Sequence, residues 1–528
     1  MRLLRLRSAA RILAAIAILA TRGGAEIDRT VHPLAINQIG YSTEAPKRFT
    51  APLSPDGTPF IIRLADSRDI LHRGEIRNHI GDFTGFRPAE SARHFVIEVR
   101  GGELKPAVSE PFLIRPDLLQ EQYWQPAIDF LIDARSVTGT HPSAFGGCPW
   151  RDGNYYDAII PSLVLLHLAD PARIKAMPRQ IDWAADKARV LDPTFEYDAK
   201  TPESGGVMEA VAKYYSELEP PSPDAPDVVK LIHWGAGFYL MKPATKDPMG
   251  DPEPRQIHAQ TVEQVSYVLW AWPSLKQWLP QSFYDRCRDF CFANWEKSLA
   301  IDEKWWDPKS YDAPPEGNNP MAGRLHPYKG RHAPGHSIVP NLLMHEVAKR
   351  EKRDDAAKYL TAATAQAAYL VERLDWNDPR STKGHRMSEH WTIPKLNDVG
   401  STVSFPAIAT AASWVVRDPA LKSRLQELAV CHIDIAFGRN PRLAAAPHLP
   451  QPGFPEIERG WPIGHKLDVC ARLELCRGAI SSGPGSEMFP FQPEAAFRHA
   501  EGWVNYGASW CTSLFYLEID ATATTPDL

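Results

Sequence analysis

The chain has 528 residues, of which 44% are hydrophobic and 23% are charged, so it is long and apolar enough to bury large cores. This composition excludes a disordered protein. A formal net charge of -5 at pH 7 leaves no broad basic face, so we expect no nucleic acid as a partner.

The first 25 residues show the pattern of a secretory signal peptide. Four arginines precede an apolar run at 12–20, and small residues follow up to Ala25. The run is about half as long as the roughly twenty residues of a membrane-spanning helix, so cleavage near Ala25 is favoured over an uncleaved anchor. We therefore expect a secreted or periplasmic protein with no integral membrane span once residues 1–25 are removed.

Residues 27–119 show the pattern of a small all-β sandwich. Short alternating or β-branched runs, such as "FIIRLAD" and "HFVIEVRGG", are separated by Gly, Pro, Asp and Ser at roughly ten-residue spacing. A sugar-binding module and a structural brace share this pattern. No exposed aromatic platform of the kind that binds sugar stands out, which favours the brace.

After Gln120 the hydrophobic period becomes helical, and about a dozen helical segments follow. Long polar loops lie at 302–335, 376–402 and 440–499, and loops of this length usually carry function. Helices joined by alternately short and long connections favour an all-α toroid over 121–520, with the long loops lining a cleft at one end. No convincing repeat period supports a solenoid.

The seven cysteines contain no Cys-x-x-Cys pair, so we expect no zinc site. Their pairing into disulfides cannot be read from the sequence. No cofactor is predicted, and a structural calcium ion is left open.

Five stretches, in matching order along the chain, resemble motifs of glycoside hydrolase family 9, the cellulase-type inverting enzymes. The resemblance implies an N-terminal immunoglobulin-like domain on a six-hairpin (α/α)6 toroid, and hydrolysis of O-glycosidic bonds. The stretches are "INQIGYSTEAPKRF" (36–49), "PDAPDVVKLIHWGAGFYLMK" (223–242), "AFGRNPR" (436–442), "GAISSGPGSE" (478–487) and "EGWVNYGASW" (501–510).

The last stretch places Glu501 at the position of the family's general acid, because Tyr506 and Ala508 follow it at the family's spacing. Glycosidic cleavage needs a protonated carboxyl group beside the leaving oxygen. A glutamate held against Trp503 and Tyr506 in a partly apolar cleft would have the raised pKa that this role requires. The alternative is a solvated glutamate at the start of a helix.

The partner carboxylate is expected within "GGCPWRDGNYYDAIIPSL". The resemblance places Trp150 and Tyr155 on the family's Trp-x-Asp-Ala-Gly-Asp-Tyr motif, with one residue missing between them. Asn154 then stands at the position of the family's base, and an amide has no useful proton affinity near neutral pH. Asp152 matches the first aspartate and is the predicted base. Asp157 is a weaker substitute, and capping of the following helix is the alternative role of Asp152.

His465 and Arg472 are the nearest equivalents of the family's sugar-contacting His-His-Arg motif, although the tight spacing is absent. Other Arg and His residues crowd the same loops. Guanidinium groups bind carboxylates with two parallel hydrogen bonds, which suggests an acidic sugar. Equally, these side chains could pair with acidic residues of the loops. Trp150 is a candidate for stacking on a sugar face, and a loop-pinning Trp is its alternative.

Together these features predict an exported glycoside hydrolase that acts by inversion on a carbohydrate substrate. Glu501 is the acid and Asp152 the base, while Asn154, Tyr155 and Tyr506 contact water or substrate. Two alternatives stay open. One is a uronate lyase, with Asn154 neutralising the carboxylate and Tyr155 or a loop histidine removing a proton. The other is a carbohydrate-binding relic that has lost its base.

Overall fold

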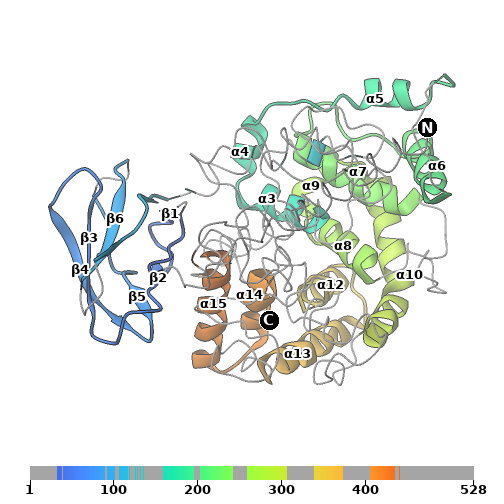
Figure 1. Ribbon diagram of the computed structural model, residues 1–528. Helices are drawn as coiled ribbons and strands as arrows, with labels where there is room; N and C mark the ends of the chain where they lie inside the picture. The colour runs from blue at the N-terminus through green and yellow to red at the C-terminus, as the bar shows by residue number, and fades with distance from the viewer. Residues whose placement is uncertain are drawn as a thin grey trace, which may run out of the picture.

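The chain divides into an all-β unit followed by an all-helical unit, as the sequence predicts. In the computed structural model the last described strand ends at Ile114, and every described element beyond it is helical (Figure 1). The predicted signal peptide at 1–25 lies outside the described residues. The structure describes residues 33–38, 40–89, 92–100, 106–116, 118, 125, 128, 131–132, 135, 159–194, 202–241, 259–305, 338–372, 405–434 and 439.

The strands, hereafter the β-unit, form one six-stranded antiparallel sheet in the order β2-β5-β4-β3-β6-β7 and one parallel pair, β1 with β8. Isolated bridges, Ala35 with Thr50 and Phe95 with Phe112, join the chain beside the parallel pair to the larger sheet. The strands are β1 (Gly40–Tyr41), β2 (Arg48–Thr50), β3 (Pro59–Leu64), β4 (Ile70–Arg77), β5 (Ile80–Asp82), β6 (Phe95–Val99), β7 (Ala107–Val108) and β8 (Leu113–Ile114).

Aromatic rings fill the interior of the β-unit. The rings of Phe49 and Phe60 meet edge to face at 5.0 Å, and both side chains are fully buried. A Cβ atom at Gly81 would lie 2.0 Å from the Phe49 ring, and one at Gly74 would lie 2.3 Å from the Phe60 ring. These two glycines therefore give the rings room against the neighbouring strands.

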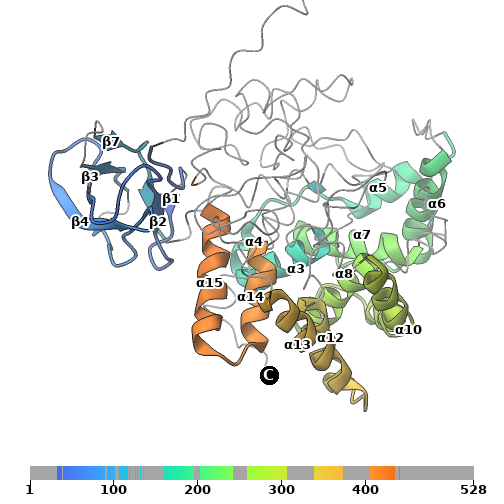
Figure 2. The same cartoon turned by 60° about the horizontal axis from the view of Figure 1, so that its bottom comes forward.

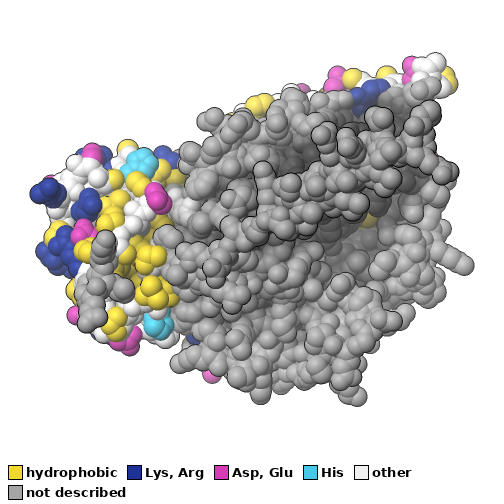
Figure 3. Space-filling view, in the orientation of Figure 1, with side chains coloured by type: hydrophobic (Ala, Val, Ile, Leu, Met, Phe, Trp, Pro, Cys, Tyr) yellow, Lys and Arg dark blue, Asp and Glu magenta, His cyan; other side chains and the backbone are white. Residues whose placement is uncertain are grey.

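The described surface of the β-unit carries aliphatic and charged side chains. Among its described residues the exposed large hydrophobic side chains are aliphatic: Leu53, Ile70, Leu71 and Val108. On the face drawn in Figure 3, hydrophobic side chains of the β-unit gather toward its middle, and Lys and Arg side chains lie mostly at its outer edge. No Phe or Tyr ring of the described β-unit is exposed, so the described residues offer no flat Phe or Tyr platform for a pyranose face.

In the helical unit, helices adjacent in sequence pack as hairpins, and one helix of each hairpin faces the common centre (Figure 1). Helix α3 (Ile159–Ala169) packs against α7 and α8, and α12 packs against α8 and α14. The hairpins are α6 (Pro202–Glu217) with α7 (Asp227–Met241), α8 (Ala259–Trp270) with α10 (Gln281–Trp305), α12 (Ile338–Arg350) with α13 (Ala356–Glu372), and α14 (Phe405–Val415) with α15 (Pro419–Asp434).

Composition explains which helices lie inside. The sequence "IIPSLVLLHLA" of α3 is apolar on all sides, and residues 159–167 are buried. Helix α7 likewise buries nearly every residue, whereas α10 and α13 carry polar outer faces. Three short helices, α4 (Pro171–Ala176), α5 (Trp183–Val190) and α9 (Trp272–Leu275), complete the described elements. None of the described helices is both long and apolar enough to cross a lipid bilayer.

Candidate functional site

All the site residues predicted from the sequence lie outside the described residues, namely Trp150, Asp152, Asn154, Tyr155, His465, Arg472, Glu501 and Tyr506. Their mutual distances therefore stay predictions. The structure does describe the elements next to them in the chain. Helix α3 follows the Asp152–Tyr155 segment, and Arg439 is the one described residue of the "AFGRNPR" stretch at 436–442.

Helix α8 supports the start of α3. The Oε1 atom of Gln264 lies 3.5 Å from the backbone nitrogen of Ile160, at the long end of hydrogen-bonding distance. Gln264 is 2% exposed, and its Nε2 group has no hydrogen-bond partner among the described residues. A buried amide donor without a partner is uncommon in native structures. Gln264 lies beside the start of α3, the helix that follows the predicted base in the chain.

A second polar cluster, hereafter the joint, connects the β-unit to the end of α15. The Nδ2 group of Asn37 donates to Oδ1 of Asp434 at 3.0 Å, and Oδ2 of Asp434 lies 3.7 Å from Nη1 of Arg439. All three residues are buried, and Arg439 is fully buried. Figures 1 and 2 both show the β-unit beside α15. The joint brings together "INQIGYSTEAPKRF" and "AFGRNPR", two of the stretches that carry the family resemblance.

Burial dominates the electrostatics of the joint. Removal from water raises the pKa of Asp434 to about 7, while Arg439, the hydrogen bond from Asn37 and the charge of Arg48 oppose this rise. Burial and the neighbouring Asp434 carboxylate likewise raise the pKa of Tyr41. Asp434 therefore titrates near neutral pH, unlike an exposed aspartate.

Arg48 reinforces the contact at its edge. Its Nε donates to Asp82 at 2.9 Å, and its Nη2 lies 3.4 Å from Glu427 of α15. Its carbonyl oxygen accepts a hydrogen bond from the Tyr41 hydroxyl at 2.8 Å. Glu427 and Asp82 are partly exposed, so water screens these ion pairs and each contributes little to stability.

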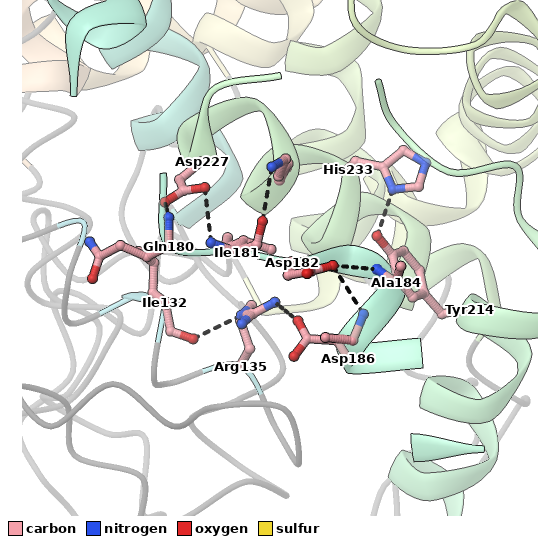
Figure 4. Close-up of polar contacts among 12 residues, drawn as sticks. Ile132, Arg135, Gln180, Ile181, Asp182, Ala184, Asp186, Tyr214, Asp227 and His233 are labelled. Atoms are coloured by element: carbon pink, nitrogen blue, oxygen red, sulfur yellow. Dashed lines mark hydrogen bonds and ion pairs between the residues drawn. The ribbon is translucent and has the colours of Figure 1, made fainter. Parts of the chain in front are cut away.

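A third cluster fixes the chain between α4 and α5 against α7 (Figure 4). Asp227, in the "PDAPDVV" stretch, accepts the backbone N–H groups of Gln180 at 2.5 Å and Ile181 at 3.2 Å. Lys230 donates to the carbonyl oxygen of Ile181 at 2.9 Å. Burial raises the pKa of Asp227, and the two N–H donors and Lys230 oppose this rise. Every polar atom in this exchange is satisfied locally, which is typical of a structural staple.

Figure 4 shows three further contacts near this cluster. Arg135 pairs with Asp186 at 2.9 Å and donates to the carbonyl oxygen of Ile132 at 2.8 Å. The Tyr214 hydroxyl lies 2.6 Å from Nδ1 of His233, whose pKa burial lowers to about 3. His233 is therefore neutral near pH 7 and serves as a hydrogen-bonding core residue.

No group of three or more His, Cys, Asp or Glu side chains within the described ranges could hold a metal ion. The buried carboxylates of Asp227 and Asp434 have fixed hydrogen-bonding neighbours, so we assign them to the framework and not to proton transfer with a substrate. Sequence reasoning did not single out Asn37, Gln264 or Asp434. A buried polar residue within an otherwise apolar helix, as Gln264 is in "TVEQVSYVLW", was the available signal for one of them.

No family model matches the chain, and no curated protein matches it. Several solved structures do. A single mutant of the thermostable endoglucanase from Alicyclobacillus acidocaldarius is 14% identical, with a TM-score of 0.49 over 92% of this chain and 99% of its own. A GH9 protein of Bacteroides ovatus is 12% identical, with a TM-score of 0.45 over 93% and 99%. The GH family 9 endoglucanase J30 is 14% identical, with a TM-score of 0.44 over 90% and 99%.

These identities and TM-scores are too low to carry substrate or mechanism from one protein to the other. The similarity concerns the fold. Solved structures similar to this chain thus include endoglucanases of glycoside hydrolase family 9, the family that its sequence motifs resemble.

Proposed function

We propose that the chain is an exported glycoside hydrolase that cleaves O-glycosidic bonds of a polysaccharide or oligosaccharide. The proposal is supported by five motif stretches in the family's order and by an all-β unit followed by helical hairpins. The observation that carries it is the joint. Asn37 of one stretch donates a hydrogen bond to Asp434, 397 positions later, and Asp434 lies 3.7 Å from Arg439 of a second stretch.

This contact bears on the resemblance because the stretches were matched by sequence alone. Short, degenerate motifs arising by chance would have no reason to meet in a buried polar cluster. Asn37 and Arg439, one from each stretch, both pair with Asp434. In this chain the two stretches therefore meet around one buried carboxylate, which favours the residue roles that the motifs imply.

In the proposed mechanism Glu501 donates a proton to the leaving oxygen. Asp152 removes a proton from the attacking water on the opposite face of the sugar ring, with Asn154 orienting that water. Inversion requires the two carboxyl groups to lie about 6.5–9.5 Å apart, leaving room for the water. Trp150, Tyr155 and Tyr506 would contact the substrate, and His465 and Arg472 would contact its hydroxyl or carboxylate groups. The arginine-rich loops favour an acidic sugar.

Product analysis tests the proposal. Purified protein is incubated with neutral and uronate-containing oligosaccharides, and reducing ends, ultraviolet absorbance and product anomers are followed. We expect new reducing ends without ultraviolet absorbance. The first NMR spectra should show products with inverted anomeric configuration. Ultraviolet absorbance from an unsaturated uronate would identify the protein as a lyase and not a hydrolase. Asn154 at the base position favours this alternative. Retention of oligosaccharide without any product would identify a binding relic.

A further inference from the structure

One face of the larger sheet, hereafter the arginine face, can be followed across four strands through their register. Arg73 of β4 lies opposite Ile61 of β3, and Ile61 lies opposite Glu98 of β6. Glu98 in turn lies opposite Val108 of β7. Residues paired in this way project from the same side of a sheet. The aromatic core, with Phe60, lies on the other side. The main side chains of the arginine face are those of Ile61, Arg63, Arg73, Glu98, Arg100 and Val108.

The arginine face is open on the side away from the helical unit. Figures 1 and 2 both show β3 and β4 on the side of the β-unit that is farther from α15. Arg73 and Val108 are exposed, at two ends of the same row of paired residues. The described helices therefore leave this face accessible to a partner from solution.

Two arginines of the face already hold one carboxylate. The Nε of Arg100 donates to Oε1 of Glu98 at 2.7 Å, and the Nε of Arg63 lies 3.5 Å from Oε2. Arg63 is itself fixed, because its Nη1 donates to the carbonyl oxygens of Leu64 and Ser67 in the turn after β3. The hydrogen bond from Arg100 lowers the pKa of Glu98, and Arg63 adds to this effect, so Glu98 is ionised at neutral pH.

Arg73 is the guanidinium group of the face that remains available. It makes no ion pair among the described residues, and neither does Glu75, the other carboxylate on this side of β4. Neighbouring strands lie about 4.8 Å apart, so Arg73 on β4 starts about 10 Å from Glu98 on β6. Arg100 still exposes about half of its side chain. The face thus presents guanidinium groups at two separated places.

Aliphatic side chains lie between these charges. Ile61 and Val96 are buried although they lie outside the aromatic core, and Val108 is exposed. Val96 is paired with Arg63, and Ile61 with Arg73. The methylene stem of an arginine can cover an aliphatic neighbour while its guanidinium group stays in water. Guanidinium groups therefore alternate with apolar surface across the sheet.

We propose that the arginine face binds an anionic polysaccharide whose sugars carry carboxylate groups. Such a polymer has a matching alternation, because carboxylates and apolar C–H faces of the sugar rings recur along it. Its carboxylates would pair with Arg73 and Arg100, since guanidinium groups accept carboxylates with two parallel hydrogen bonds, and ring faces would contact Val108. The inference goes beyond the proposed function, because it assigns a binding surface to the β-unit and does not require the protein to cleave the polymer.

Binding of the full-length protein to polygalacturonate tests the inference. The neutral comparison is the same polymer with its carboxyl groups reduced to alcohols. Retardation in gels that contain either polymer gives Kd in the cold, at low and at high salt, over a time too short for cleavage. Arg73→Glu reverses the available charge. Arg286→Glu is the matched control, because it makes the same charge change at an exposed position of α10. Circular dichroism checks that each variant is folded.

Arg73→Glu should raise the Kd for polygalacturonate by about tenfold at low salt, the scale of an exposed ion pair replaced by repulsion. Arg286→Glu should change it by less than about twofold. High salt should remove the difference between the variants, and the reduced polymer should bind weakly to all of them. If Arg73→Glu does not fold, Arg73→Ala takes its place and should raise Kd by about fivefold.

Three results would overturn the inference. The first is a parent protein that does not bind polygalacturonate. The second is an equal Kd for folded Arg73→Glu and Arg286→Glu, which would place any binding elsewhere on the protein. The third is a loss of binding to phosphatidylglycerol vesicles in Arg73→Glu with polygalacturonate binding unchanged, which would make the face a membrane contact. Absence of cleavage with binding retained would refute the proposed function alone.

Discussion

The carboxamide of Gln264 on α8 meets the backbone nitrogen of Ile160, and so holds the first turn of α3, the helix that follows the predicted base in the chain. One half of this amide is used and the other half is not, since Nε2 is buried without a partner among the described residues. Such a residue contributes little net stability, because a long hydrogen bond is offset by the cost of an unsatisfied donor.

Replacement of Gln264 by methionine separates the contribution of Gln264 to stability from its contribution to turnover. The side chain keeps nearly the same length and loses both polar atoms, so the free energy of unfolding should change by less than about 1 kcal/mol. Turnover should fall nevertheless, because the start of α3 loses its acceptor. Urea unfolding and kcat measured side by side check this. A loss of several kcal/mol would instead make Gln264 a stability residue.

Glu501→Gln tests the general acid. The amide keeps the shape of the side chain and cannot donate a proton as a carboxyl group does, so folding and ligand binding should persist. Turnover of a natural substrate should fall by roughly two to four orders of magnitude. A substrate with an activated leaving group needs little protonation and should lose much less. Equal losses on both substrates would argue against Glu501 as the acid.

Asp152→Asn should behave differently. Water must be activated whichever group departs, so both substrates should slow by a similar factor. Steady-state kinetics with the same two substrates make the comparison with Glu501→Gln direct. If Asp152→Asn retained full activity and Asp157→Asn did not, the base would be Asp157.

Asp227→Ala should be among the more destabilising substitutions in the helical unit. It leaves the N–H groups of Gln180 and Ile181 without their acceptor and removes the negative charge near Lys230, which together should cost about 3 kcal/mol. Ser216→Ala, which removes an exposed hydroxyl bonded to its own helix, is the control and should change stability by less than about 0.5 kcal/mol. Thermal or urea unfolding of the two variants measures both changes in stability.

The pH dependence of stability should report the buried Asp434 carboxyl group. Its pKa rises from 3.8 to about 7 on folding, so between these values the folded protein holds a proton that the unfolded chain has released. The contribution of this group is therefore fully present below about pH 4 and is lost as pH rises through about 7, by at most about 1.4 kcal/mol per pH unit. The Asp434→Asn variant has an amide that does not titrate in this range, so it lacks this pH-dependent contribution.

The measurement is the difference in unfolding free energy between the parent protein and Asp434→Asn at several pH values. Taking the difference removes the contributions of other buried groups, such as His167 and His233, whose depressed pKa values act in the opposite direction. The parent protein should lose stability relative to the variant as pH rises from about 4 to 7. A difference that did not vary with pH would mean that Asp434 is ionised throughout this range.

The succession of a β-unit and a helical unit could be predicted from the sequence, because the secondary structure of each segment follows from a local pattern of residues. A short apolar, β-branched run bounded by turn residues, such as "FIIRLAD", forms β3, in which residues 60–62 are all buried. An apolar segment such as "IIPSLVLLHLA" forms a buried helix. The family resemblance also came from short stretches read one at a time. The roles of Glu501 and Asp152 rest on those stretches and remain predictions.

Only the tertiary structure decided which distant residues meet. Whether Asn37 contacts Asp434 depends on how the hairpins stack and where α15 ends beside the β-unit, and no local pattern encodes a contact across 397 positions. The raised pKa of Asp434 follows from the same arrangement, because loss of water around a carboxyl group is set by the packing of both units and not by the residues beside it in the chain.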